Sequence, residues 1–174
     1  MHNFRKLFFL IAFFIVFTST VKAQKNNSLP LTRIEFLFDA SQSMYAQWQT
    51  NTRFEIAKKL LSEMVDSLDK ITNVEMALRV YGHTKKFPPQ DCDDTRLEVP
   101  FGKNTAYLIK KRLSEISPSG TTPIAQSLNQ CGNDFPADPA RNIIILITDG
   151  KPGFIGEHLV KNPGIFFCVN SFII

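Results

Sequence analysis

Apolar residues along this chain follow two kinds of spacing, one typical of strands and one typical of helices. Short apolar runs, and one stretch in which every second residue is apolar, predict strands. Longer stretches with apolar residues three and four positions apart predict helices that bury one side. The predicted strands cover residues 31–38, 73–81, 96–101, 142–148 and 165–174, and the predicted helices cover residues 52–68, 104–116 and 123–131.

Local signals mark where the predicted helices begin and which side they bury. Thr52 and Glu55 form a capping box at the start of the first helix. Pro123 suits the first position of the third helix, because its fixed φ is already helical. The apolar side predicted for the second helix consists of Leu108, Ile109, Leu113 and Ile116.

The order of these elements predicts the fold class. Strands that alternate with helices are typical of an α/β fold, here a doubly wound, mostly parallel sheet with helices on both faces. Ligands of such folds bind beyond the carboxyl ends of the strands. Asp39 and Asp149 each follow an apolar strand, so we expect their carboxylates at the same edge of the sheet.

The first residues have the layout of a secretory signal peptide. Two basic residues precede an unbroken apolar run of 11 residues, and a small-x-small pattern ends at Ala23. The run is too short for a membrane anchor, which needs roughly 20 apolar residues. We expect a signal peptide over residues 1–23, a short polar tail over residues 24–30 and one domain over residues 31–174. This layout predicts a secreted or periplasmic protein without stable membrane insertion after cleavage.

Charge and cysteine content exclude several classes of function. Loss of Arg5, Lys6 and Lys22 with the leader lowers the formal net charge from +4 to +1, so the charge does not favour binding to nucleic acid. The three cysteines are too widely spaced for a zinc site. A pairing of Cys92 with Cys131 stays open, but isolated thiols are the better interpretation.

Three segments place oxygen-bearing side chains where a cation could bind. The first strand leads into Asp39, Ser41 and Ser43, which offer one carboxylate and two hydroxyls on a single loop. Thr122 precedes the third helix, and Asp149 follows a buried strand. Oxygen ligands of low total charge suit a hard cation such as Mg²⁺. Each segment alone is also an ordinary turn or cap, so the prediction depends on all three together.

In their order and spacing, these motifs resemble the metal-ion-dependent adhesion site of the von Willebrand factor type A domain. Residues 31–174 are similar to that fold, which integrin inserted domains share. The resemblance implies Mg²⁺ as the cation, with Mn²⁺ or Ca²⁺ as alternatives, and a protein partner that supplies an Asp or Glu carboxylate. It therefore implies an adhesion or binding module rather than an enzyme, and the signal-like leader adds the expectation that this module is exported. The metal ligands that it implies are Asp39, Ser41, Ser43, Thr122 and Asp149.

Other readings of the same residues stay open. A metal-assisted phosphatase or hydrolase could use Asp39, although aspartate phosphatases need a second Asp where this chain has Ser41, and no Gly-x-Ser-x-Gly motif occurs. The acidic group at residues 91–94 could hold a second cation such as Ca²⁺ or form a solvated turn. Tyr45 and Trp48 could contact a partner beside the metal or pack against the first helix.

The C-terminal part departs from the family pattern. A crossover helix is expected after Asp149, but prolines and glycines crowd residues 150–164. We interpret this as a truncated or altered end, which would leave the fold incomplete and the last strand as an apolar edge prone to aggregation. A non-functional fragment is therefore a further alternative.

Overall fold

The computed structural model describes residues 29–149 and the backbone of residues 165–168. The predicted signal peptide, most of the predicted polar tail, the segment 150–164 and residues 169–174 lie outside the described residues.

One five-stranded sheet organises the domain, in the order β5-β4-β1-β6-β7. β1 pairs in parallel with β4 and with β6, β6 pairs in parallel with β7, and β5 runs antiparallel to β4 at the edge. The predicted mostly parallel sheet is therefore confirmed. The strand bounds are Thr32–Asp39 for β1, Val74–Tyr81 for β4, Thr95–Gly102 for β5, Arg141–Ile147 for β6 and Ile165–Cys168 for β7.

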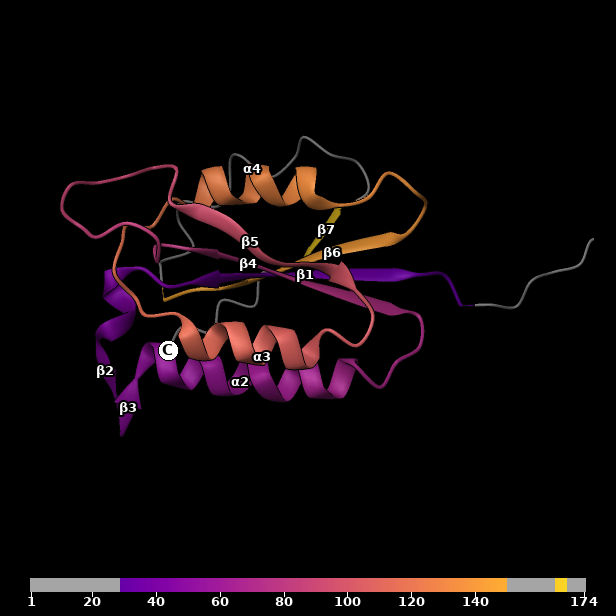
Figure 1. The fold of residues 1–174 in the computed structure, drawn as a ribbon, viewed down its shortest axis with the longest axis horizontal. Coiled ribbons are helices and arrows are strands. Elements are labelled where there is room, and N and C mark those ends of the chain that lie inside the picture. Colours follow the sequence, from indigo (N-terminus) through magenta and orange to yellow (C-terminus); the bar gives the residue numbers. More distant parts are fainter. Residues whose placement is uncertain (1–28, 150–164, 169–174) are drawn as a thin grey trace, which may run out of the picture.

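Helices cover both faces of the sheet, as the doubly wound prediction requires. Helices α2 (Arg53–Leu68) and α3 (Ala106–Glu115) lie side by side on one face, and α4 (Ile124–Asp134) lies on the other (Figure 1). Thr52 caps α2, with its hydroxyl accepting the Glu55 N–H at 3.2 Å. This is the hydroxyl half of the predicted capping box.

Strand β1 lies at the centre of the core. Every residue from Arg33 to Asp39 is buried, because β1 has a neighbouring strand on each side and helices over both faces. On the α2 and α3 face, the Phe38 and Phe54 rings meet edge to face with centroids 5.6 Å apart. On the α4 face, Leu37 packs in a second cluster with Cys131.

Three details refine or correct the helix and strand predictions. Leu108 was predicted on the buried side of α3, but it is 50% exposed, because α3 buries a narrower stripe that includes Ile109 and Leu113. Pro123 is the N-cap of α4 and not its first helical residue. In β4, the residues between the predicted apolar positions are also covered: Glu75 is half-buried, and Ala77, Arg79 and Tyr81 are buried.

A small ribbon precedes α2. Strands β2 (Gln47–Trp48) and β3 (Asn51–Thr52) pair antiparallel and extend away from the sheet, next to the short 3₁₀ helix η1 (Gln42–Tyr45) (Figure 1). Tyr45 is exposed, and Trp48 is half-buried in the ribbon. Among the described helices, none has the length and apolar character needed to cross a membrane.

Candidate metal site

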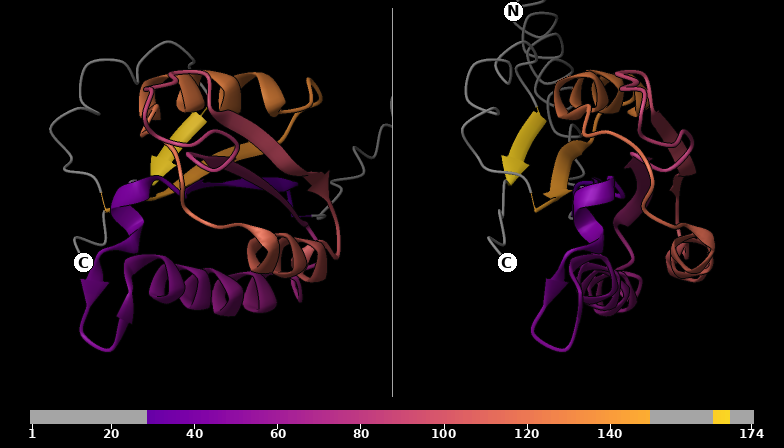
Figure 2. Two further views of the ribbon diagram at one scale, coloured as in Figure 1. Left: turned by 60° about the vertical axis from the view of Figure 1, so that its left-hand side comes forward. Right: turned by 90° about the vertical axis from the view of Figure 1, so that its left-hand side faces the viewer.

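Two parallel strands bring two acidic residues to one edge of the sheet. β1 ends at Asp39, and Asp149 follows the last residue of β6 by two positions. The strands are direct neighbours, with Phe38 opposite Ile147. Both carboxylates therefore lie at the carboxyl edge of the sheet, as the sequence predicts. The right-hand view of Figure 2 looks onto this edge, with η1 in front of it.

The loop before α4 is attached to the same edge through its main chain. Gly120 forms a β-bridge with Ser41. The Gln42 N–H donates to the Gly120 carbonyl at 3.0 Å, and the Ser119 N–H donates to the Ala40 carbonyl at 3.1 Å. These bonds hold the loop that carries Thr122 against the loop that carries Ser41 and Ser43.

A glycine makes this close packing of loops feasible. Gly82 follows β4, has a φ of +74°, and lies where a Cβ would come within 2.7 Å of the Ser41 backbone. The left-handed conformation and the short distance both disfavour a side chain there. The turn after β4 therefore packs directly against the Ser41 loop and fixes its position.

Hydroxyl and carboxylate oxygens form a connected group at this edge. The Ser41 and Ser43 Oγ atoms lie 3.0 Å apart at hydrogen-bond distance, and Ser43 Oγ donates to Asp149 Oδ1 at 2.9 Å. Three of the five predicted ligands are thus linked directly to one another. The set contains oxygen and no sulfur or imidazole nitrogen, which is the donor type that Mg²⁺ and Ca²⁺ prefer.

Asp39 lies directly beneath these oxygens and is completely buried. Its Oδ1 accepts the Ser41 N–H at 2.8 Å, and its Oδ2 accepts the Thr148 hydroxyl at 2.6 Å. Burial raises the pKa of Asp39, and the hydrogen bonds from Ser41 and Thr148 only partly offset this. Among the described residues it has no ion pair. A cation at this edge would supply the missing opposite charge.

Thr148 and Tyr81 were not predicted as part of the site. Tyr81 lies opposite Asp39 in the β1–β4 ladder and is completely buried. Burial and then the Asp39 carboxylate raise the pKa of Tyr81 well above its ordinary value. Both residues stand at the carboxyl ends of central strands, which is the signal that could have identified them.

Thr122 differs from the other predicted ligands. It is exposed, and its hydroxyl makes no hydrogen bond to the part of the chain that the structure describes. Its carbonyl accepts the Ile124 N–H at 3.0 Å at the start of α4. The structure therefore places the Thr122 loop at the site without joining its hydroxyl to the other oxygens.

Arg53 is a site residue that the sequence analysis missed. Its Nη1 donates to Asp149 Oδ2 at 2.5 Å, and the two side chains are 31% and 4% exposed, respectively. Arg53 is the first residue of α2, immediately after the Thr52 cap. A guanidinium thus compensates the Asp149 carboxylate from the side opposite Ser43.

The acidic group at residues 91–94 builds a turn. Asp94 is buried and accepts hydrogen bonds from the Thr84 N–H at 3.0 Å, the Thr84 hydroxyl at 2.6 Å and the Lys85 N–H at 3.2 Å. Asp91 pairs with the Lys85 ammonium at 2.5 Å. Within the described ranges, no group of three or more His, Cys, Asp and Glu side chains is placed to hold a metal.

The two cysteines with described side chains are free, with Cys92 exposed and Cys131 buried. The pairing of Cys92 with Cys131 is therefore excluded, and the interpretation as isolated thiols is confirmed for these two residues.

Comparison with known proteins matches the sequence to a family. The family model of the von Willebrand factor type A domain matches residues 34–151. The uncharacterized protein YwmD of Bacillus subtilis is 34% identical over 126 residues, which cover 69% of this chain and 55% of that protein. The chain spans about half the length of the curated relatives that it matches.

Solved structures show the same architecture. An aerotolerance-related membrane protein from Bacteroides fragilis, in a form with multiple mutations to serine, aligns with a TM-score of 0.53 and 27% identity over 68% of this chain and 54% of that chain. The von Willebrand factor domain of the type V pili tip protein Mfa5 from Porphyromonas gingivalis aligns with a TM-score of 0.53 and 20% identity over 71% of this chain and 39% of that chain. The second likeness concerns the fold alone.

Proposed function

This chain belongs to the von Willebrand factor type A domain family, and on that premise we propose that it is a binding module that holds a divalent cation and engages a protein carboxylate through it. The observation that carries the proposal is the placement of Asp39. This carboxylate is completely buried, lacks an ion pair among the described residues, and lies under hydroxyls that are linked to a second carboxylate. Such an arrangement is stabilised when a cation neutralises it.

The donor set suits Mg²⁺, with Mn²⁺ or Ca²⁺ as alternatives. Asp39 and Asp149 would supply negative charge, directly or through water, and Ser41, Ser43 and Thr122 would supply neutral oxygens. A bound cation with few charged ligands remains electrophilic and can accept a carboxylate from another protein. The chain's own residues would fix the cation at the edge of the sheet, where a partner can reach it.

We propose binding rather than catalysis at this site. Both Asp39 carboxylate oxygens accept hydrogen bonds from within the protein, and the side chain is completely buried. A nucleophilic aspartate must present an oxygen to its substrate, and Asp39 does not. The burial of Asp39 therefore disfavours a metal-assisted phosphatase or hydrolase that uses this residue.

The proposed location is secreted or periplasmic. Export would expose the cation edge to partners outside the cell. The signal-like leader in the sequence supports this.

Thermal unfolding of the full chain in EDTA, in Mg²⁺ and in Mn²⁺ tests the cation site. A ligand that binds the folded state alone adds about 2.7 kcal/mol of stability at a hundred times its dissociation constant. We expect metal to raise the melting temperature of the wild type and to have little effect on Ser43→Ala or Asp39→Asn. Ser67→Ala is a matched control, because the Ser67 hydroxyl donates to the Glu63 carbonyl on the exposed side of α2. A melting temperature indifferent to metal in the wild type would exclude the proposed site.

A further inference from the structure

A basic hollow lies next to the cation edge and has no role in the site described above. Its volume is about 460 Å³. Its walls come from the turn after β4, from β5, from the end of α3 and from the loop that follows α3. The side chains that matter for its chemistry are His83, Lys86, Arg96, Arg112 and Glu115.

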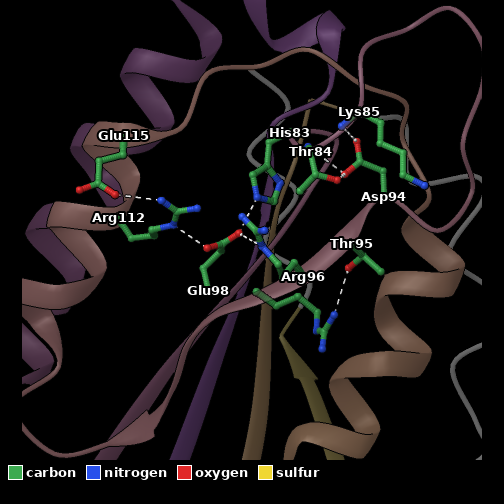
Figure 3. A network of polar contacts seen from close by, with 10 residues as sticks. His83, Thr84, Lys85, Asp94, Thr95, Arg96, Glu98, Arg112 and Glu115 are labelled. Atoms are coloured by element: carbon green, nitrogen blue, oxygen red, sulfur yellow. Dashed lines mark hydrogen bonds and ion pairs between the residues drawn. The ribbon is translucent and has the colours of Figure 1, made fainter.

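Glu98 organises the two arginines of the hollow. Its carboxylate accepts from Arg96 Nε at 2.6 Å and from Arg112 Nε at 2.5 Å, as Figure 3 shows. Burial raises the pKa of Glu98, but the hydrogen bonds from Arg112, Arg96 and His83 outweigh it and lower the pKa to about 2. The carboxylate therefore stays charged and keeps both guanidinium groups in place.

Donor groups remain after these bonds are made. Arg112 Nη1 donates to Glu115 Oε2 at 2.8 Å. In the part of the chain that the structure describes, Arg112 Nη2, both Nη atoms of Arg96 and the Lys86 ammonium have no hydrogen-bond partner. The cationic side chains of Lys86, Arg96 and Arg112 thus outnumber the two carboxylates, which belong to Glu98 and Glu115. The hollow offers a net positive charge and several unpaired N–H groups to an anion.

His83 adds a buried polar atom at the same wall. Its side chain is 4% exposed, and its Nε2 lies 2.6 Å from Glu98 Oε1. Its Nδ1 is buried without a hydrogen-bond partner among the described residues. An anion in the hollow would favour the protonated ring, whose Nδ1–H can then donate a hydrogen bond. The unpaired Nδ1 is thus a second observation, besides the cationic side chains, that favours an anion in the hollow.

The hollow is separated from the cation edge by a single layer of chain. Ser119 lines the hollow, and its N–H donates to the carbonyl of Ala40, which lies between Asp39 and Ser41. Gly82, next to His83, packs against the Ser41 backbone. The hollow and the cation edge are therefore neighbours on either side of this loop.

We propose that the basic hollow binds a second acidic side chain of the same protein partner whose first carboxylate reaches the cation. This inference rests on the proposed function, and it narrows the partner to a protein segment with two acidic residues. Linking two anchors on one segment raises the affinity above that of either alone.

The test uses the full chain and a labelled tetraglutamate peptide, with binding followed by fluorescence anisotropy at fixed ionic strength. In EDTA the peptide should bind the wild type, and Lys86→Glu should weaken this binding about tenfold. Arg96→Lys, which keeps a positive charge beside Glu98 but removes the unpaired Nη donors, should weaken it as well. Lys103→Glu is the matched control, because Lys103 is exposed and follows β5 at the opposite edge of the sheet. It should leave binding unchanged.

Adding Mg²⁺ separates the two proposals. The wild type should then bind the peptide at least tenfold more tightly, and Asp39→Asn should lose this gain. If the peptide binds in EDTA but gains nothing from Mg²⁺, the cation does not hold a partner carboxylate. The proposal that one partner contacts both the cation and the hollow would then be wrong as well. No binding in EDTA, or equal effects of Lys86→Glu and Lys103→Glu, would overturn the hollow alone. If inorganic phosphate at the same concentration as the peptide displaces the peptide, the hollow is a general anion site. That result would also overturn the proposal that the hollow binds an acidic side chain of a protein.

Discussion

The Asp149 carboxylate is shared between two parts of the protein. Its Oδ1 accepts from Ser43, and its Oδ2 accepts from the Arg53 guanidinium. A divalent cation that uses Asp149 would bring a second positive charge close to Arg53. Because like charges repel at short range, cation binding should weaken this ion pair or displace the guanidinium.

Arg53→Ala should therefore tighten Mg²⁺ binding, by about tenfold or ~1.4 kcal/mol. The same substitution should destabilise the metal-free protein by about 1–3 kcal/mol, because the Asp149 side chain, which is 4% exposed, loses its cationic partner. Mg²⁺ should restore most of that loss. Isothermal titration and urea unfolding in EDTA and in Mg²⁺ measure the two effects.

Lys58→Ala is the control for this experiment, since Lys58 also lies on α2 but pairs with the exposed Glu55. It should leave Mg²⁺ affinity unchanged. Weaker Mg²⁺ binding by Arg53→Ala would mean that the guanidinium assists the cation instead of competing with it.

Glu35 is a second carboxyl group whose position affects the domain. It is completely buried in β1, 3.7 Å from Arg79 Nε, while Arg79 makes a double hydrogen bond to Asp134 of α4. Burial and then the neighbouring Asp134 raise the pKa of Glu35 from 4.5 to about 9. The folded protein therefore holds a proton here at neutral pH that the unfolded chain has released.

Because of this proton, the stability of the folded protein should fall as the pH rises. The folded state binds the extra proton between pH 4.5 and about 9, so the contribution of Glu35 is fully present below pH 4.5 and declines as the pH rises towards 9. Glu35→Gln should remove this slope and raise the unfolding free energy at pH 7 by about 3 kcal/mol. Urea unfolding at pH 5, 7 and 8.5 measures it.

Glu55→Gln, on the exposed side of α2, should leave the slope as in the wild type. A Glu35→Gln protein less stable than the wild type at pH 8.5 would show that the Glu35 carboxylate is charged and paired with Arg79.

Among the loops, the turn after β4 contacts both of the loops that carry predicted ligands, the Ser41 loop and the loop before α4. It supports the Ser41 loop through Gly82 and receives the Gly120 N–H on the Gly82 carbonyl at 2.8 Å. The turn therefore couples the Asp39 loop to the Thr122 loop without contributing a ligand. A change in this turn should act on the proposed cation site from outside it.

Gly82→Ala should destabilise the protein by more than about 2 kcal/mol and weaken Mg²⁺ binding. The left-handed backbone costs an alanine roughly 1–2 kcal/mol, and the new Cβ would press on the Ser41 backbone from 2.7 Å. Thermal unfolding and Mg²⁺ titration check both effects. Gly102→Ala is the comparison, because a Cβ there meets only the Thr105 side chain, at 3.1 Å. Equal effects of the two substitutions would refute this role of the turn.

Across the domain, the features that the sequence predicted are those that the spacing of apolar residues determines. The strands, the helices and the shared edge of Asp39 and Asp149 follow from apolar spacing and from the rule for parallel strands. Leu108 was misplaced because a helix of ten residues need not bury every apolar position. Arg53 and Thr148 were missed because their contacts span 96 and 109 residues, and no local pattern reports such pairs.

The central place of β1 has a mechanical consequence. The strand runs straight from the start of the described chain to the proposed binding edge and is already extended over its eight residues. Tension between Leu29 and Tyr45 would therefore pass along this backbone, in which only the short helix η1 can still lengthen, and the rest of the fold would carry almost no load. Optical-trap pulling from handles at these two exposed positions should extend η1 at most and give no global unfolding step, whereas pulling between Leu29 and the exposed Tyr107 of α3 should unfold the domain. A full unfolding step in the first geometry would contradict this load path. If β1 carries the load in this way, the domain could stay folded under a strong force applied between a partner at the binding edge and the N-terminal end of β1.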